Sequence, residues 1–168
     1  MIVLETERLI LRHATVGDAP FMFKLLNDPS WIEFIGDRGI KTVEDAQNYI
    51  LDRIIKSYEE NGFGLFLTVL KKDKTPIGLC GLVNRPQIED VDIGFAFMPG
   101  FKGKGYGYES ASAVIKYGRE KFGLQKIAAI TVKENVRSIA LIKKLGLRYE
   151  KTFAFDGSSD MAELYVSD

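Results

Sequence analysis

Apolar residues recur with helical spacing in four stretches of the chain: 15–29, 42–62, 134–146 and a stretch that ends at Gly123. The stretch ending at Gly123 is the most regular, and glycine commonly follows the last turn of a helix. Its core-facing positions are Ala111, Val114, Ile115, Gly118 and Phe122. The first two stretches open with Thr-x-x-Asp, whose side chains can cap the backbone at a helix start. The pattern predicts four helices.

Seven other segments alternate apolar and polar residues or are rich in β-branched and aromatic residues, which indicates strands. They are 7–13, 63–71, 77–83, 91–98, 126–133, 147–155 and 161–166. Short polar connections favour antiparallel pairing of the second, third and fourth, and turn-forming residues at 156–159 predict a hairpin between the last two. Residues 30–41 have no clear period and are expected to form a loop or a short helix. This order predicts an α/β fold of the α+β kind, with a mixed, mostly antiparallel sheet of about seven strands and about four helices.

Length and composition favour one compact domain over residues 1–168. The chain has 168 residues, 46% of them hydrophobic, which is long enough for one hydrophobic core and short for two domains. The longest apolar run, 63–70, is too short to span a bilayer, and the acidic start of the chain does not resemble a signal peptide. We therefore expect a soluble, cytoplasmic protein.

The charge balance and the reactive residues argue against several functions. Lysine plus arginine and aspartate plus glutamate both number 23, so we expect no general attraction to nucleic acid or to anionic membranes. His13 is the only histidine, which disfavours a metal site, a Ser-His-Asp triad and a Cys-His pair, and we expect it to close the first strand. Cys80, the only cysteine, lies between Leu79 and Leu82 and is expected to be reduced and buried.

The segment between the fourth predicted strand and the next helix contains three alternating glycines. Gly103, Gly105 and Gly107 allow positive φ angles and close approach of a ligand to the backbone. The amides that open the following helix, the helix dipole and the charges of Lys102 and Lys104 favour an anion such as phosphate or pyrophosphate. The alternative is a flexible glycine turn without a ligand.

Two well-known phosphate-binding patterns do not fit this segment. Gly100 and Gly105 have the spacing of a Walker loop, but Tyr106 and Gly107 follow where Lys and Ser or Thr are required. The pattern Gly-x-Gly-x-x-Gly of dinucleotide sites fails because the third glycine comes one residue early and the segment lies past mid-chain. An anion site here therefore belongs to another class.

With this segment, the helix and strand after it, and Asn135, the chain resembles the GNAT superfamily of acetyl-CoA-dependent N-acetyltransferases along nearly its whole length. The pyrophosphate motif of that superfamily, Gln/Arg-x-x-Gly-x-Gly/Ala, is matched by residues 102–107 with lysine in the first position. Lysine keeps the charge but lacks the planar fork of arginine. Residues 99–109, 5–12 and 135–146 are similar to the branch that contains ribosomal-protein acetyltransferases. Three motifs in the right order are more specific than the glycines alone.

The resemblance implies a GNAT-like, splayed sheet. The strand ending at Met98 and the strand starting near Lys126 would diverge and leave room for the pantetheine arm of acetyl-CoA, the implied cosubstrate. The strand backbone would pair with pantetheine, and loop amides would bind the pyrophosphate. The implied cofactor-binding residues are Phe97, Met98, Lys102, Gly103, Lys104, Gly105, Tyr106, Gly107, Tyr108 and Asn135. For Asn135, a plain helix N-cap is the alternative.

The resemblance also suggests the catalytic residues. Many superfamily members carry a tyrosine acid at the position of Ile142, so that role is vacant here. Ser138 is expected to serve the leaving thiolate, with a solvent-facing or capping serine as the alternative. Asp92 is the expected base, with a surface carboxylate as the alternative. Glu109 matches a frequent family acid but is expected to favour the helix dipole.

The implied activity is acyl transfer from acetyl-CoA to a primary amine by direct attack. The acceptor is a small molecule or a protein N-terminal α-amine, and its pocket is expected to draw on residues 31–39 and the terminal hairpin. A polyamine or antibiotic acetyltransferase and a CoA-binding module without turnover are the alternatives. The expected partners are acetyl-CoA and the amine, with no nucleic acid or membrane, and the expected state is a monomer or homodimer without a metal.

Overall fold

Eight strands form one sheet in this computed structural model, which describes residues 1–155 and 160–168. Their order across the sheet is β1-β2-β3-β4-β5-β6-β8-β7. Their bounds are β1 (Ile2–Glu5), β2 (Leu9–Arg12), β3 (Leu65–Leu70), β4 (Pro76–Val83), β5 (Asp92–Phe97), β6 (Ala128–Thr131), β7 (Arg148–Ala154) and β8 (Met161–Val166). Neighbouring strands are antiparallel except β5 and β6, which are parallel, so the predicted mixed, mostly antiparallel sheet is confirmed. The hairpin turn predicted at 156–159 lies outside the described residues.

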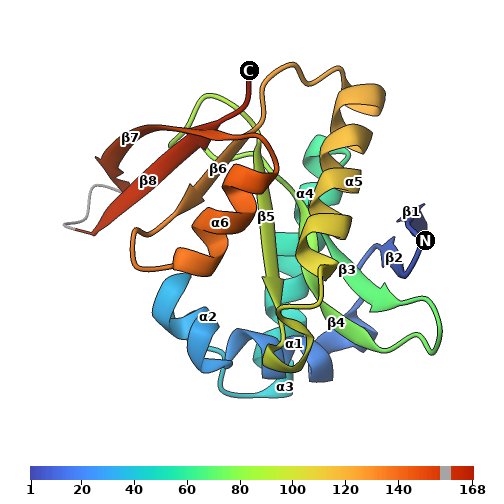
Figure 1. Ribbon diagram of the computed structural model, residues 1–168. Helices are drawn as coiled ribbons and strands as arrows, with labels where there is room; N and C mark the ends of the chain where they lie inside the picture. The colour runs from blue at the N-terminus through green and yellow to red at the C-terminus, as the bar shows by residue number, and fades with distance from the viewer. Residues whose placement is uncertain (156–159) are drawn as a thin grey trace.

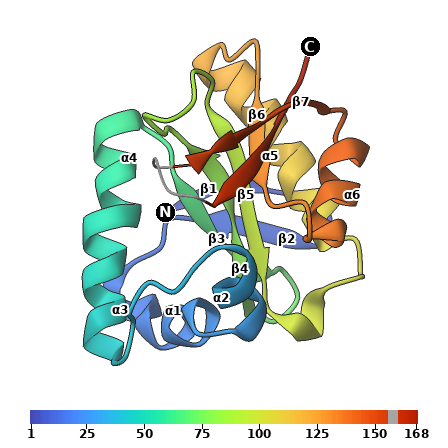
Figure 2. The ribbon, with the colours of Figure 1, turned by 90° about the vertical axis from the view of Figure 1, so that its left-hand side faces the viewer.

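Helices cover both faces of this sheet (Figure 1). Their bounds are α1 (Ala19–Leu26), α2 (Pro29–Phe34), α3 (Val43–Tyr49), α4 (Lys56–Asn61), α5 (Tyr106–Phe122) and α6 (Val136–Lys144). A π-helical turn, Ile50–Ile55, joins α3 and α4 into one continuous rod. Figure 2 shows this rod on one side of the sheet and α5 and α6 on the other. None of the helices that the structure describes has the length and apolar character needed to cross a membrane.

One element goes beyond the predicted set, and one uncertain segment is now assigned. The pattern does not predict β1, an edge strand of four residues whose Ile2 is 56% exposed, because so little of it is buried that its alternation is weak. The aperiodic segment after residue 29 contains α2, which agrees with the expected loop or short helix. Both Thr-x-x-Asp capping boxes are present, at Thr15 and Thr42.

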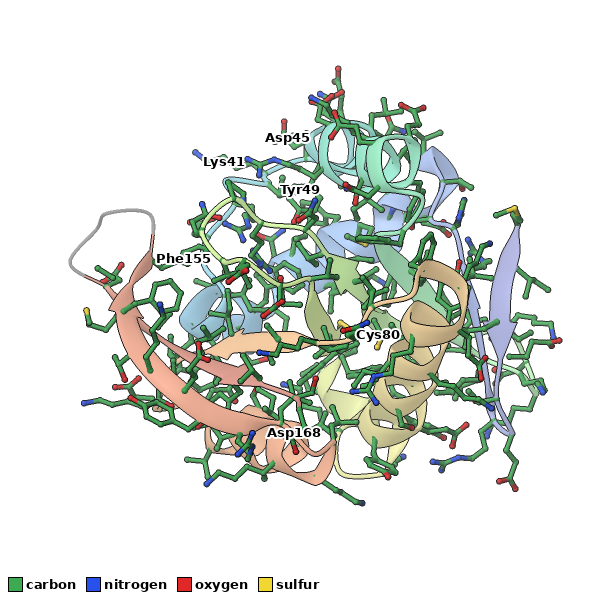
Figure 3. All side chains as sticks on the ribbon, turned by 90° about the horizontal axis from the view of Figure 1, so that it is seen from above. Lys41, Asp45, Tyr49, Cys80, Phe155 and Asp168 are labelled. Carbon is green, nitrogen blue, oxygen red and sulfur yellow. The ribbon has the colours of Figure 1, made fainter. Side chains whose placement is uncertain are left out.

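Two hydrophobic clusters attach the helices to the sheet. Phe66 and Val114 belong to the cluster beneath α5 and α6, and Met22 and Leu67 belong to the cluster beneath α1 and the α3–α4 rod. Cys80 is fully buried in the first cluster, as expected, and Figure 3 shows it in the interior of the molecule. Burial raises the pKa of the Cys80 thiol to about 12, so this cysteine is not a nucleophile.

The strands β5 and β6 meet at one residue pair. Asp92 lies opposite Ala128, and the Ala128 amide donates to the Val91 carbonyl at 2.9 Å. From there β5 continues to Phe97 along β4, whereas β6 continues to Thr131 along β8. The two strands therefore diverge, and among the described strands none covers the β6-facing edge of β5 beyond Asp92.

Candidate active site

A cleft of about 2320 Å³ extends along the diverging strands β5 and β6. The start of α6 lines it beside these strands, and α2 and the α3–α4 rod also line it. Of the residues expected to act on a ligand, its lining contains Asp92, Phe97, Lys102, Gly103, Gly105, Gly107, Tyr108, Asn135 and Ser138. Met98, Lys104 and Tyr106 lie outside this lining, and the Met98 amide donates to the Ile77 carbonyl at 2.9 Å.

The loop between β5 and α5 needs glycine for two different reasons. Gly103 and Gly105 have φ angles of 76° and 85°, in the left-handed region that glycine adopts without strain. A Cβ atom at Gly107 would lie 2.9 Å from Cδ2 of Leu141, so this glycine allows α5 to pack closely against α6. The alternating glycines therefore set both the path of the loop and its distance from the neighbouring helix.

The first turn of α5 leaves three backbone amides without intrahelical partners. Gly105 is the N-cap and has no side chain to offer, and the first helical bond runs from the Glu109 amide to the Gly105 carbonyl at 3.0 Å. The amides of Tyr106, Gly107 and Tyr108 precede that bond and carry the positive end of the helix dipole. A helix start of this kind suits a phosphate or pyrophosphate group.

Glu109 joins the beginning of the chain to α5. Its carboxylate accepts hydrogen bonds from the Arg8 Nε at 2.7 Å, the Arg8 amide at 2.9 Å and the Thr6 hydroxyl at 2.5 Å. Burial acts to raise the pKa of Glu109, but the bonds from Thr6 and Arg8 outweigh it and hold that pKa below its ordinary value. Arg8 also donates to the Lys104 carbonyl at 3.1 Å, so the loop is fixed from this side. This geometry agrees with a structural role for Glu109.

The two lysines of the loop have different surroundings. The Lys102 Nζ donates to the Ser30 Oγ at 2.8 Å, so this ammonium group contacts α2. The Lys104 Nζ lies 6.0 Å from the ring centroid of Phe101, within the loop segment itself. The Lys102 side chain is therefore engaged with a protein group, while Lys104 stays exposed on the loop.

Asp92 is buried at the point where β5 and β6 part. It is 2% exposed, and Arg85 Nε donates to its Oδ1 at 3.0 Å and to its Oδ2 at 3.3 Å. Burial raises the pKa of Asp92 to about 6, and the charge and hydrogen bonds of Arg85 act in the opposite direction. A carboxyl group with this pKa can accept a proton near neutral pH. The surface-carboxylate alternative for Asp92 does not fit its burial.

The start of α6 brings Asn135 and Ser138 together. Asn135 is the N-cap, and its side-chain oxygen accepts a hydrogen bond from the Ser138 amide at 3.2 Å. The Ser138 side chain is half-buried and lines the cleft. Ile142, the position expected to lack a catalytic tyrosine, is buried in the core. Asn135 is thus a helix cap that also lines the cleft.

The far wall of the cleft comes from the α3–α4 rod and the C-terminal hairpin. Tyr49 of α3 and Phe155, which follows β7, both line the cleft and are labelled in Figure 3. The guanidinium carbon of Arg85 lies 5.9 Å from the Phe155 ring centroid, which links this hairpin to the Asp92 ion pair. The π-helical turn Ile50–Ile55 follows Tyr49, and such turns occur frequently at functional sites.

Several contacts of the site could not be predicted from local sequence. Arg85 lies in an irregular loop, and no motif indicates that it contacts Asp92. The segment at Asp28 was expected to end a helix, and in the structure Asp28 caps the next one and supports Ser30. Among the described residues, no group of three or more His, Cys, Asp or Glu is arranged to hold a metal ion.

The sequence matches the family model of the acetyltransferase (GNAT) domain over residues 8–148. It is 31% identical over 155 residues to the uncharacterized protein YkkB of Bacillus subtilis. The matched region covers 89% of this chain and 87% of that protein. It is 27% identical over 150 residues to the uncharacterized N-acetyltransferase YnaD of the same organism, with coverage of 89% and 85%.

The fold is similar to that of a solved structure described as RimL, ribosomal L7/L12 α-N-protein acetyltransferase, in complex with coenzyme A. The TM-score is 0.83, and the match covers 99% of this chain and 97% of that chain. The sequence identity is 15%, so this likeness concerns the fold.

Replacing Gly105 with alanine should weaken acetyl-CoA binding about tenfold, which corresponds to about 1.4 kcal/mol. The new Cβ would lie 3.2 Å from the Arg8 Nη2, and a left-handed alanine is strained by about 1–2 kcal/mol, so the loop and its amides must shift. Calorimetric titration gives the Kd for acetyl-CoA, and urea denaturation gives the free energy of unfolding.

Gly123→Ala is the matched control. Gly123 ends α5 with a φ angle of 66°, so alanine there is strained in the same way, far from the loop. This variant should lower the free energy of unfolding and leave the Kd unchanged. An unchanged Kd in Gly105→Ala, or an equal loss of affinity in both variants, would argue against the loop as the anion site.

Proposed function

Because the chain belongs to the acetyltransferase (GNAT) family, and is therefore an acetyl-CoA-dependent N-acetyltransferase, we propose that its acceptor is the α-amine of a protein or peptide N-terminus. The observation that carries this proposal is the buried Asp92, whose pKa is about 6, at the apex of the cleft. Such a carboxylate is a base of moderate strength, and moderate strength suits an amine that loses its proton easily.

The energy of proton transfer separates the possible acceptors. Moving a proton from an α-ammonium group of pKa about 8 to a carboxylate of pKa about 6 costs about 3 kcal/mol. Moving it from a lysine side chain of pKa about 10.4 costs about 6 kcal/mol. The difference of about 3 kcal/mol comes from the two amines, so it favours an α-amine over a lysine or a polyamine amine of similar basicity for any base, and with Asp92 the α-amine leaves the smaller cost.

On this proposal, the donor side of the cleft is built mainly from backbone. Acetyl-CoA supplies an acetyl group activated as a thioester. The loop amides from Gly103 to Tyr108 bind its pyrophosphate, and the open edge of β5 up to Phe97 pairs with the pantetheine arm as an added strand. Asn135 lies beside them at the start of α6.

Two side chains then act as the general base for the amine and as the hydrogen-bond donor to the leaving thiolate. Asp92 removes a proton from the amine, directly or through a water molecule, and Arg85 holds the carboxylate in place. The Ser138 hydroxyl donates toward the departing thiolate, whose pKa of about 8.5 by analogy with cysteine means that it needs only modest help. Backbone amides along β5 polarise the carbonyl of the thioester.

The balance of charges in the cleft also supports an acceptor that is neutral or carries both charges, rather than a polyamine. Eight acidic and eight basic side chains contribute to its lining among the described residues. A polycationic substrate would be expected to meet an excess of carboxylates. The RimL enzyme, whose fold this chain shares, is described as an α-N-protein acetyltransferase, which agrees with the proposal.

The proposal predicts that peptides with a free N-terminus are acetylated in preference to other amines. Release of CoA thiol should be measured with acetyl-CoA and a panel of short peptides, and mass spectrometry should locate the acetyl group. The matched control is each peptide with a blocked N-terminus and one lysine, and spermidine and an aminoglycoside complete the panel. Faster turnover of spermidine, the aminoglycoside or the blocked peptides than of free peptides would contradict the proposal.

Replacing Asp92 with asparagine should remove the acidic limb of the pH profile. In the unmodified protein, kcat/KM should fall as the pH drops through about 6, because protonated Asp92 cannot accept a proton. The variant should lose about 10²- to 10⁴-fold in kcat/KM and show no inflection near that pH. Asp90→Asn, two residues earlier and outside the cleft lining, is the control with the same change of charge. An acidic limb that survives in Asp92→Asn would show that Asp92 is not the base.

The same substitution has a defined effect on stability. The folded state raises the pKa of Asp92, so it binds more protons than the unfolded chain between about pH 4 and about pH 6. The contribution of this carboxyl group to the free energy of unfolding therefore falls as the pH rises through that window. Asp92→Asn should remove this part of the decline, which denaturation at several pH values measures independently of activity.

A further inference from the structure

One chain of hydrogen bonds connects the glycine loop to α2. The Lys102 Nζ donates to the Ser30 Oγ at 2.8 Å, and the Ser30 hydroxyl donates to the Asp28 carboxylate. The Ser30 amide also donates to that carboxylate, at 3.2 Å. We call these three residues the Lys102 link. Ser30 and Lys102 are 72 residues apart in sequence, so the link is a tertiary contact between two walls of the cleft.

The short helix α2 depends on such contacts for its position. It has six residues, and a helix of this length is not stable on its own. Ile32 is 40% exposed, and Trp31 is the buried residue of the helix itself. The packing of Trp31 and the link through Ser30 therefore contribute to the placement of α2, together with its connection to α1.

The burial of Asp28 explains why a cation belongs in this link. Asp28 is only 8% exposed. A buried carboxylate is unfavourable unless it is hydrogen-bonded and compensated by positive charge. Within residues 1–155 and 160–168 no ion pair of Asp28 is found, and the ammonium group of Lys102 reaches it through the Ser30 hydroxyl. A Lys102 that turned toward a phosphate would leave this carboxylate without that charge.

We propose that Lys102 is a positioning residue, which holds α2 and Trp31 in place as part of the acceptor wall through Ser30 and Asp28. Its side chain therefore connects the loop that binds the donor to the wall that receives the acceptor. The terms donor and acceptor rest on the function proposed above, whereas the link itself is a property of the free protein. The charge available to the donor phosphates from the loop is then that of Lys104, which is exposed and lies over Phe101.

The chain offers a matched set of variants for testing this assignment. Lys102→Met and Ser30→Ala each break the link, Lys102→Arg keeps a charge of similar reach, and Lys104→Met removes the other loop lysine. Trp31 is the only tryptophan, and its buried Nε1 has no hydrogen-bond partner among the described residues, so its fluorescence reports water that enters beside α2. The readouts are the Trp31 emission spectrum, the Kd for acetyl-CoA by calorimetry, and kcat and KM for the best peptide acceptor.

Breaking the link should change the surroundings of Trp31 and weaken binding of the acceptor amine, while binding of acetyl-CoA stays the same. Lys102→Met and Ser30→Ala should both shift the emission to longer wavelength and raise the acceptor KM about tenfold, with the acetyl-CoA Kd within about twofold of the unmodified protein. The double variant should be no worse than either single one, because both remove the same interaction. Lys102→Arg should restore most of the emission spectrum. Lys104→Met should do the reverse, weakening acetyl-CoA binding while Trp31 emission is unchanged.

Other outcomes would overturn the proposal. A Lys102→Met variant with unchanged Trp31 emission and a tenfold weaker acetyl-CoA Kd would make Lys102 a phosphate ligand. Ser30→Ala without effect on emission would show that the link does not hold α2, and this mild substitution decides the matter even if Lys102→Met does not fold. Emission and acetyl-CoA binding need no acceptor, so a failure of the proposed α-amine specificity would leave these two results intact and separable.

Discussion

The single contact between β5 and β6, at Asp92 and Ala128, determines the architecture of the site. If the two strands stayed paired, their facing N–H and C=O groups would bond to each other and no cleft would open between them. Because they part after one pair, the edge of β5 faces a cleft along its remaining length, and the strand leads directly into the glycine loop. The same divergence places a buried carboxylate at the apex, where a strand interior would normally carry an apolar side chain.

The two sides of the cleft use different kinds of groups. On the side of the loop, the geometry comes from glycines and from the first turn of α5, fixed to the start of the chain by Arg8 and Glu109. Backbone amides of this kind can bind a phosphate whatever the second substrate is. On the other side, α2, the α3–α4 rod and the terminal hairpin present side chains of both charges and several aromatic rings. This division agrees with one common donor and an acceptor chosen by side chains, and the Lys102 link is our proposal for how the two sides are joined.

How much the sequence could predict depends on how far apart the interacting residues lie in the chain. The loop and α5 were predicted because glycine spacing and helical period are local, and the Asn135 cap on Ser138 is a contact across three residues. The environment of Asp92 depends on Arg85 in an irregular loop and on burial beneath distant elements, so its raised pKa could not be read from the strand pattern. Lys102 matched a phosphate motif by position, but its contact with Ser30 spans 72 residues. Local pattern therefore predicts most of the elements and the glycine loop, while the pairing of side chains across the cleft follows from the packed fold.

Hydrogen exchange with and without coenzyme A tests the central claim most directly, because the claim concerns backbone groups. If the diverging strands and the loop form the donor site, coenzyme A should slow exchange of amides between Gly94 and Phe97 that face the cleft, and of the amides from Gly103 to Tyr108. Amides of β2 and β3, which are paired within the sheet on both sides, should be unaffected and serve as the internal reference. Protection confined to other parts of the chain, with no change in β5 or the loop, would contradict this account.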